Sequence, residues 1–143
     1  ENRNEKTIYI MADTKPSSSS NQSTRPRVGV GVIVHRHDQK VLIGRRLDTH
    51  LWGFPGGHLE YGETSEVCAQ RELLEEANVD LAIEEFRQLD VFNVIRQHVG
   101  YHVVGYMVVC YADEKAVESV KNMEPHKSGD WEWKSWQEMI DDL

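Results

Sequence analysis

The stretch GHLEYGETSEVCAQRELLEEANV, residues 57–79, decides how the rest of this chain is interpreted. Its pattern predicts a loop followed by a helix over about residues 65–77. Thr64 is suited to cap the first turn of that helix, and Asn78 follows its last periodic residue. The helix is therefore expected to have a defined beginning and a defined end.

The predicted helix carries acidic side chains on one face. Because an α-helix repeats every 3.6 residues, Glu72, Glu75 and Glu76 project from the same side. Like charges at this spacing repel, and Mg²⁺ or Mn²⁺ is the natural compensation because hard cations take oxygen ligands. Arg71 is next to the cluster but off its face, where it can reach back and hold Glu63. The opposite side, expected to face the core, carries Val67, Leu73, Leu74 and Ala77.

The same stretch resembles the Nudix box, G-x5-E-x7-R-E-U-x-E-E-x-G-U, in which U is an apolar residue. The matching positions are Gly57, Glu63, Arg71, Glu72, Leu73, Glu75, Glu76 and Val79. Asn78 stands where the pattern has glycine, and asparagine is the next-best residue at a left-handed helix end. An ordinary solvated acidic face is the alternative for the run ELLEE, but it does not account for the flanking glycines and spacing. The resemblance implies an α/β fold, the Nudix α/β/α sandwich with a mixed β-sheet and the Nudix loop and helix.

The resemblance also implies a chemistry, the metal-assisted hydrolysis of a pyrophosphate linkage. The expected ligands of Mg²⁺ or Mn²⁺ are the carboxylates of Glu72, Glu75 and Glu76 and the carbonyl of Gly57. Arg71 and Glu63 are expected to belong to the catalytic set as a positioning pair. For the general base, Glu75 is the first choice and Glu60, in the loop, is the second.

The residues before the box resemble the family as well. The run WGFPGG, residues 52–57, is similar to a lead-in where a strand runs up to the catalytic loop. Substrate contacts are expected from Phe54, Gly56 and His58, and for His58 a structural or solvent contact is the alternative. Arg46 is expected to contact a phosphate, because an arginine at the matching place in similar enzymes lines the pocket. A surface salt bridge is the alternative for Arg46.

The likeness extends from about residue 25 to residue 139, with RPRVGVGVIV at residues 25–34 and WEW at residues 131–133. Over this range the chain is similar to the nucleotide-pool Nudix diphosphatases of the vertebrate type-15 and plant type-1 branch. That similarity implies hydrolysis of nucleoside triphosphates, often with oxidised or modified guanine, to monophosphate and pyrophosphate. Gly105 stands where relatives can carry a polar pocket residue, so base preference stays open.

Two other functions stay open. One is a Nudix enzyme for another diphosphate, such as a nucleotide sugar, ADP-ribose, a dinucleotide or a pterin triphosphate. The other is a non-catalytic nucleotide-binding module, against which the intact Glu72, Glu75 and Glu76 argue. The phosphorus that water attacks is open as well.

Length, charge and cysteine content limit the classes of function. A chain of 143 residues suggests one domain, and a net charge of −8 with a pI near 5.3 argues against binding a nucleic-acid polymer. A small anionic nucleotide would then arrive with its own cation. Cys68 and Cys110 form no CxxC pair, and no apolar run is long enough to span a membrane. We therefore expect a cytoplasmic protein with reduced thiols and no membrane partner, and leave its oligomeric state open, a homodimer included.

The first 25 residues are polar and rich in serine, so they predict a disordered tail before a Nudix hydrolase domain at residues 26–143. Met11 is a possible natural start, in which case residues 1–10 are foreign to the natural protein. Alternatively, the run TIYI at residues 7–10 adds a short strand.

The remaining pattern predicts a sheet and a last helix. Strands are expected at residues 27–35, 41–45, 79–83, 88–96, 101–111 and 131–134, and 88–96 can form a hairpin with 101–111. Ser135 is suited to cap a short final helix. Trp131, Trp133 and Trp136 are expected to seal the sheet against that helix, with stacking on a substrate base as the alternative. In similar Nudix enzymes this helix continues and helps to close the base pocket. Here the chain ends at Leu143, so either it is trimmed or its pocket closes differently.

Overall fold

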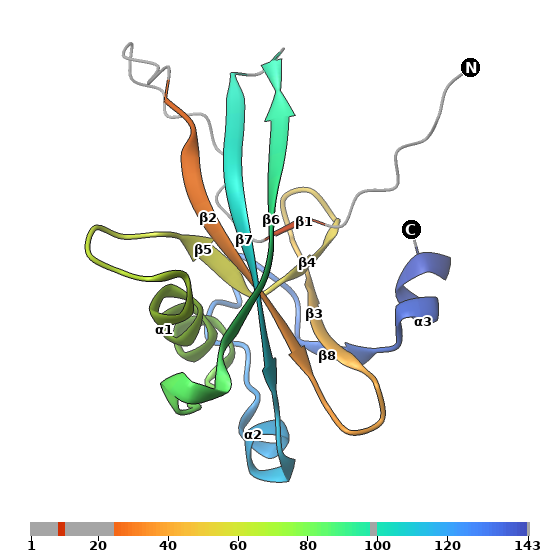
Figure 1. The fold of residues 1–143 in the computed structure, drawn as a ribbon. Coiled ribbons are helices and arrows are strands. Elements are labelled where there is room, and N and C mark those ends of the chain that lie inside the picture. The colour runs from red at the N-terminus through yellow and green to blue at the C-terminus, as the bar shows by residue number, and fades with distance from the viewer. Residues whose placement is uncertain (1–8, 11–24, 98–99, 143) are drawn as a thin grey trace.

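The structure is a computed structural model that describes residues 9–10, 25–97 and 100–142. Within these residues it contains one sheet and four helical segments (Figure 1). The strands are β1 (Tyr9–Ile10), β2 (Arg27–His35), β3 (Val41–Arg45), β4 (Trp52–Phe54), β5 (Gly56–His58), β6 (Arg87–Arg96), β7 (Tyr101–Tyr111) and β8 (Glu132–Lys134). The helical segments are α1 (Ser65–Ala77), the 3₁₀ turn η1 (Ile83–Glu85), α2 (Glu114–Ser119) and α3 (Trp136–Asp141).

The sheet is mixed, and β2 is its central strand. The strand order is β1-β4-β3-β2-β7-β6, with β5 pairing to β2 and β8 pairing to β3. β2 runs parallel to β7 from Arg27 opposite Val103 to His35 opposite Tyr111, whereas β6 and β7 form an antiparallel hairpin. The predicted mixed sheet and the predicted hairpin are therefore confirmed.

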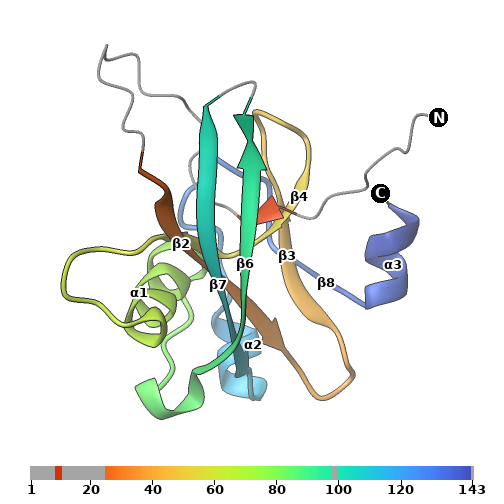
Figure 2. The same ribbon diagram turned by 45° about the horizontal axis from the view of Figure 1, so that its top comes forward.

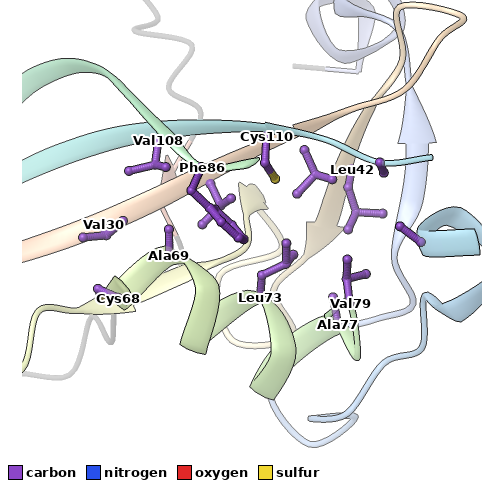
Figure 3. Close-up of a cluster of buried hydrophobic side chains, with 14 residues drawn as sticks. Val30, Leu42, Cys68, Ala69, Leu73, Ala77, Val79, Phe86, Val108 and Cys110 are labelled. Atoms are coloured by element: carbon purple, nitrogen blue, oxygen red, sulfur yellow. The ribbon is translucent and has the colours of Figure 1, made fainter. Parts of the chain in front are cut away.

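Helices cover both faces of this sheet. Because side chains alternate along a strand, Val30, Val32 and Val34 of β2 point to one face and Ile33 to the other. The first core cluster lies under α1 and α2, and includes the three valines with Leu42, Leu73, Ala77, Phe86, Val108 and Ala116 (Figure 3). The second core cluster lies on the other face, and consists of Val41, Ile43, Trp52, Phe54 and Met139, the last from α3. This arrangement is the predicted α/β/α sandwich.

Helix α1 begins and ends where the sequence predicts. The Thr64 hydroxyl accepts a hydrogen bond from the backbone N–H of Val67, and Asn78 adopts a left-handed conformation with φ of 58°. The prediction for its inward face is wrong in part, because Val67 and Leu74 are 39% and 44% exposed. Leu73 and Ala77 are buried as predicted, and Cys68, Ala69 and Glu76 are buried as well. The helix is rotated so that Glu76 faces the backbone of β5, and this brings Cys68 and Ala69 rather than Val67 and Leu74 against the sheet.

The strand predicted at residues 79–83 is absent from the described structure. The segment leaves α1 in an irregular path and ends in η1, where the N–H of Glu85 donates to the carbonyl of Ala82. The amide of Gln70 on α1 donates to the carbonyl of Leu81 over 2.8 Å. Side-chain and local partners thus satisfy backbone groups that a strand would have paired in the sheet.

The other predicted strands are confirmed with small changes in their ends, and so is the final capped helix. Tyr9 and Ile10 form β1 alongside β4, in agreement with the short strand considered for residues 7–10. Apart from these two residues and Arg25, the predicted disordered tail lies outside the described residues. Trp131 and Trp133 were predicted to seal the sheet against α3, and this is wrong. They pack against the first core cluster, which lies under α1. None of the described helices is long and apolar enough to cross a lipid bilayer.

Candidate active site

An arginine–glutamate pair joins the loop after β5 to helix α1. The Arg71 guanidinium donates from Nε to Glu63 Oε1 over 2.6 Å and from Nη2 to Glu63 Oε2 over 3.0 Å. These hydrogen bonds lower the pKa of Glu63 to about 2, so the carboxylate stays ionised at neutral pH. Arg71 Nη2 also donates to the carbonyl of His58 over 3.2 Å. The predicted pairing is present, and it holds the loop against the helix at two points.

The same guanidinium reaches the acidic face of α1. Its Nη1 donates to Glu72 Oε1 over 2.8 Å and to Glu75 Oε2 over 3.3 Å. Arg71 was expected to lie off this face, but its side chain spans the space between the two carboxylates and reduces their repulsion. Glu60, the second candidate base, is exposed in the loop with its Oε1 4.0 Å from Arg71 Nη2.

Glu72 packs directly on the backbone of Gly57. A Cβ atom at Gly57 would lie 2.2 Å from Glu72 Oε1, which is far closer than non-bonded atoms approach. A side chain at position 57 would therefore displace the end of the Glu72 side chain from its present place. The structure thus brings together one predicted carboxylate ligand and the residue predicted to contribute a carbonyl ligand.

Glu76 is the most buried carboxylate of the cluster, with 7% of its surface exposed. Its Oε2 accepts a hydrogen bond of 3.0 Å from the backbone N–H of Gly56. Burial raises the pKa of Glu76 to about 8, the hydrogen bond from Gly56 opposes this rise, and the nearby charge of Glu72 adds to it. Position 56 requires glycine, because a Cβ there would lie 2.1 Å from the backbone carbonyl oxygen of Val30.

Glu75 differs from its two neighbours in exposure. Its side chain is 56% exposed, whereas that of Glu72 is 12% exposed. Burial also raises the pKa of Glu72, although the hydrogen bond from Arg71 opposes that effect. The acidic face therefore runs from a buried carboxylate beside the loop to a solvated one at the surface.

The donor set fits a divalent cation in its chemistry. Glu72, Glu75, Glu76 and the Gly57 carbonyl offer only oxygen ligands, which Mg²⁺ and Mn²⁺ prefer. As they stand, no three His, Cys, Asp or Glu side chains in the described part of the chain form a metal cluster. Glu72 is turned to Arg71 and Glu76 to Gly56, so the predicted metal geometry stays a prediction. Burial disfavours the ionised forms of Glu72 and Glu76, and a bound cation would stabilise them.

Arg46 is placed at the end of β3 with its side chain only 8% exposed. Its guanidinium forms two hydrogen bonds of 2.8 Å with the Asp48 carboxylate, and this lowers the pKa of Asp48 to about 2. The structure thus contains the salt bridge that was the alternative for Arg46. Its predicted phosphate contact is not tested by this geometry.

Two other predicted substrate contacts have structural roles in the described residues. Phe54 is buried in the second core cluster, where its ring meets the edge of Trp136 with 6.1 Å between ring centroids. The carbonyl of His58 accepts hydrogen bonds from Arg71 and from the thiol of Cys68. Their contacts with a substrate remain predictions.

The segment between α2 and β8 reaches the site, and sequence reasoning missed it. The carbonyl of Glu76 accepts hydrogen bonds from the backbone N–H of Met123 and from the indole Nε1 of Trp131 over 3.1 and 3.0 Å. Glu124, next to Met123, adds negative charge that raises the pKa of Glu72 and Glu76 further. No spacing rule connects a single glutamate in a turn with a helix that ends nearly fifty residues earlier.

The NUDIX domain model matches residues 25–143 of this chain. A Bacillus subtilis (strain 168) protein named as an 8-oxo-dGTP diphosphatase is 42% identical over 55 residues, or 38% of this chain and 37% of that protein. An RNA pyrophosphohydrolase of Rickettsia bellii is 42% identical over 52 residues, or 35% of this chain and 32% of that protein. The chain thus aligns with about a third of the length of these relatives.

Solved structures extend the similarity to most of the chain. The MutT NUDIX hydrolase of Burkholderia pseudomallei has a TM-score of 0.69 and 27% identity, over 83% of this chain and 87% of that one. A bifunctional NMN adenylyltransferase/ADP ribose pyrophosphatase of Francisella tularensis, in complex with AMP and a manganese ion, has a TM-score of 0.66 and 25% identity, over 82% of this chain and 36% of that one. Because the NUDIX model covers everything from residue 25 onward, and the fold and the helix with its acidic face agree with it, this chain belongs to the NUDIX family.

Proposed function

We propose that this protein hydrolyses the pyrophosphate bond of nucleoside triphosphates, oxidised or modified guanine nucleotides among them, to monophosphate and pyrophosphate with Mg²⁺ or Mn²⁺. The observation that carries the proposal is the packing of Glu72 on Gly57 beside the buried Glu76, with Arg71 and Glu63 joining the helix to the loop. This arrangement places two desolvated carboxylates next to backbone oxygen and amide groups. A phosphate-bound cation suits such a site better than any neutral ligand.

The cation would be held by Glu72, Glu75, Glu76 and the carbonyl of Gly57. When bound, it supplies Lewis-acid polarisation of the phosphate oxygens and compensates the negative charge of the substrate. The manganese ion named with the Francisella tularensis relative supports this choice of cofactor. Arg71 would then keep Glu63 and the carbonyl of His58 in place, so that the loop holds its shape.

Glu75 remains the first choice for the general base. It is the exposed member of the acidic face, so a water molecule can reach it, and its distance of 3.3 Å from Arg71 keeps it directed toward the other carboxylates. Glu60 in the loop is the second choice. Glu124 becomes a third candidate because its charge acts on both Glu72 and Glu76.

The named relatives and the surface of the sheet support the choice of substrate. The relative named as an 8-oxo-dGTP diphosphatase favours a guanine nucleotide, and the likeness to the vertebrate type-15 and plant type-1 branch favours the same pool of substrates. On the sheet, Gly29 of β2 lies opposite Gly105 of β7, and neither has a side chain. The ring of Phe92 packs over Gly105, because a Cβ there would lie 2.1 Å from that ring. Phe92 would then form the wall against which the base packs.

Two rivals follow from the other relatives. An ADP-ribose pyrophosphatase and an RNA pyrophosphohydrolase are both among the proteins that this chain resembles. The net charge of −8 disfavours an RNA polymer as substrate, because a polymer needs basic surface along its backbone. The two free, buried cysteines agree with a reducing compartment, which supports a cytoplasmic protein that acts on small nucleotides.

The test is a substrate panel with the purified chain: dGTP, 8-oxo-dGTP, ADP-ribose, a nucleotide sugar, a dinucleoside polyphosphate and a 5′-triphosphate RNA, each with and without Mg²⁺. We expect metal-dependent release of pyrophosphate and monophosphate from the guanine triphosphates. Turnover of ADP-ribose or RNA alone would keep the chemistry and overturn the substrate. Glu76→Gln serves as the inactive control, and metal-independent turnover by that variant would overturn the metal site.

A further inference from the structure

Strand β6 is the outer edge of the sheet. It pairs with β7 only, and within the described residues no strand pairs with its other side. Figures 1 and 2 show β6 on the side of β7 that faces away from β2. Half of the backbone N–H and C=O groups of an edge strand point outward without a ladder partner. A long edge of this kind can pair with another strand.

Proteins protect their edge strands with charged side chains, lysine above all, with proline, short length, bulges or a covering element. β6 has some of these features, the charges of Arg87, Asp90 and Arg96 and a register shift, but it lacks others. Residues 87–96 contain no lysine and no proline, and Leu89, Val91 and Ile95 are 62%, 43% and 56% exposed. The register shift between Gln88 and Asp90 disturbs the start of the strand, and it leaves residues 90–96 as a regular segment.

This segment is complementary to itself. If a second copy pairs antiparallel with Asn93 opposite its own equivalent, Val91 lies opposite Ile95 and Asp90 lies opposite Arg96. Phe92 then lies opposite Val94. Apolar residues meet apolar residues, and each acid meets a base twice because of the two-fold symmetry.

The neighbouring registers lack this match. A two-fold axis at Phe92 would place Asp90 opposite Val94 and Val91 opposite Asn93. An axis at Val94 would place Phe92 opposite Arg96. Charges would then lie opposite apolar side chains in both cases, so the axis at Asn93 is favoured.

We propose that β6 pairs with β6 of a second copy of this chain, antiparallel and with the two-fold axis at Asn93. The two sheets then continue into each other, and α1 of each copy lies on the same side of the joined sheet. The paired segment is short, so the interface belongs to the small class that associates and dissociates readily. The dimer should therefore form as concentration rises and dissociate on dilution.

The first test is sedimentation equilibrium of the full chain from about 1 µM to about 500 µM, a range that spans weak association. We expect a shift of mass toward the dimer. Asp90→Arg should reduce dimer formation at least about tenfold, since like charges then meet across the interface, and the double variant Asp90→Arg with Arg96→Asp should restore it. A monomer at the highest concentration would overturn the proposal, including the case in which another segment of the chain covers the edge.

The second test fixes the register. Asn93→Cys places two thiols on the symmetry axis, where opposing Cα atoms are close enough for a disulfide. Val91→Cys is the matched control, because each residue 91 faces residue 95 of the other copy and the two thiols are then too far apart. Cys68 and Cys110 are buried and contribute little background. Under mild oxidation we expect the Asn93→Cys dimer to form at least about tenfold faster than the Val91→Cys dimer. Equal rates would overturn the proposed register.

Discussion

Glu76→Gln is expected to have opposite effects on stability and on activity. The wild-type carboxylate is 7% exposed and accepts a hydrogen bond from the N–H of Gly56. A glutamine amide oxygen can accept the same hydrogen bond, and it has no proton to release when the chain unfolds. In the metal-free protein the substitution should therefore stabilise the fold, whereas hydrolysis loses a proposed metal ligand.

The size and pH dependence follow from the pKa of Glu76. Burial raises this pKa from 4.5 to about 8, so the folded protein holds a proton that the unfolded chain releases between these pH values. Since the folded pKa is raised, the stability that protonated Glu76 contributes is fully present below pH 4.5. This contribution is lost as the pH rises toward 8. One pKa unit corresponds to about 1.4 kcal/mol, so at pH 7 the raised pKa of Glu76 leaves the folded protein about 3 kcal/mol less stable than below pH 4.5. For a domain of this size that energy corresponds to roughly 10 °C in Tm.

The assay is thermal unfolding in EDTA at several pH values from about pH 5 to about pH 8. Glu76→Gln should melt above wild type at pH 7, and the difference should shrink toward pH 5. Glu75→Gln is the matched control, because its side chain is 56% exposed and water solvates the charge in the folded protein. With Mg²⁺ present, Glu76→Gln should lose roughly 100-fold or more in turnover. A difference in Tm between wild type and Glu76→Gln that stays constant across this pH range would refute the reasoning.

The remaining predictions concern three other places in the fold. Gly57→Ala should reduce turnover with little loss of secondary structure by circular dichroism, because the new Cβ, 2.2 Å from the present position of Glu72 Oε1, displaces that carboxylate; normal kcat would contradict this. The thiols of Cys68 and Cys110, whose pKa values are raised to about 12 by burial, should react with Ellman's reagent at pH 8 only as fast as the protein unfolds, and immediate labelling of the native protein would contradict this. Trp131→Phe should cost about 1 kcal/mol in urea unfolding, because it removes the 3.0 Å hydrogen bond to the carbonyl near the end of α1; an unchanged midpoint would contradict this.

Local signals predicted the elements well. A capping threonine and a left-handed asparagine define the ends of α1 without help from the rest of the chain. The valine-rich run of β2 and the hairpin of β6 and β7 also follow from short-range patterns. These features depend on each segment's own residues, and this is why they could be derived from sequence.

The parts that failed depend on contacts between distant segments. The buried face of α1 includes Glu76 because the N–H of Gly56 needs an acceptor there, and this moves Val67 and Leu74 toward solvent. The segment 79–83 forms no strand, and Gln70 of α1 donates a hydrogen bond to its Leu81 carbonyl. These features depend on contacts with residues that are distant in the sequence, and hydrophobic periodicity does not predict such contacts.

The candidate site shows the same division. The Arg71–Glu63 pair could be expected from spacing within one motif, and it is present. From sequence, Arg46 is compatible both with a phosphate contact and with a salt bridge, since both need only an arginine at the end of a strand. The approach of Glu124 to the acidic face had no sequence signal at all, because a turn brings it there.

The parallel pairing of β2 with β7 has a consequence for how the chain folds. Arg27 lies opposite Val103, 76 positions later in the sequence, and every other residue pair of these two central strands has the same separation. Bringing such distant residues together costs loop entropy before any pairing energy is gained, so folding should be slow compared with that of helical domains. On the ribosome, the Nudix loop and helix emerge well before β7, and Val30, Val32 and Val34 stay without their full cover until β7 arrives. The segment predicted to bind the metal is thus synthesised early but becomes anchored only when the second half of the domain closes the sheet.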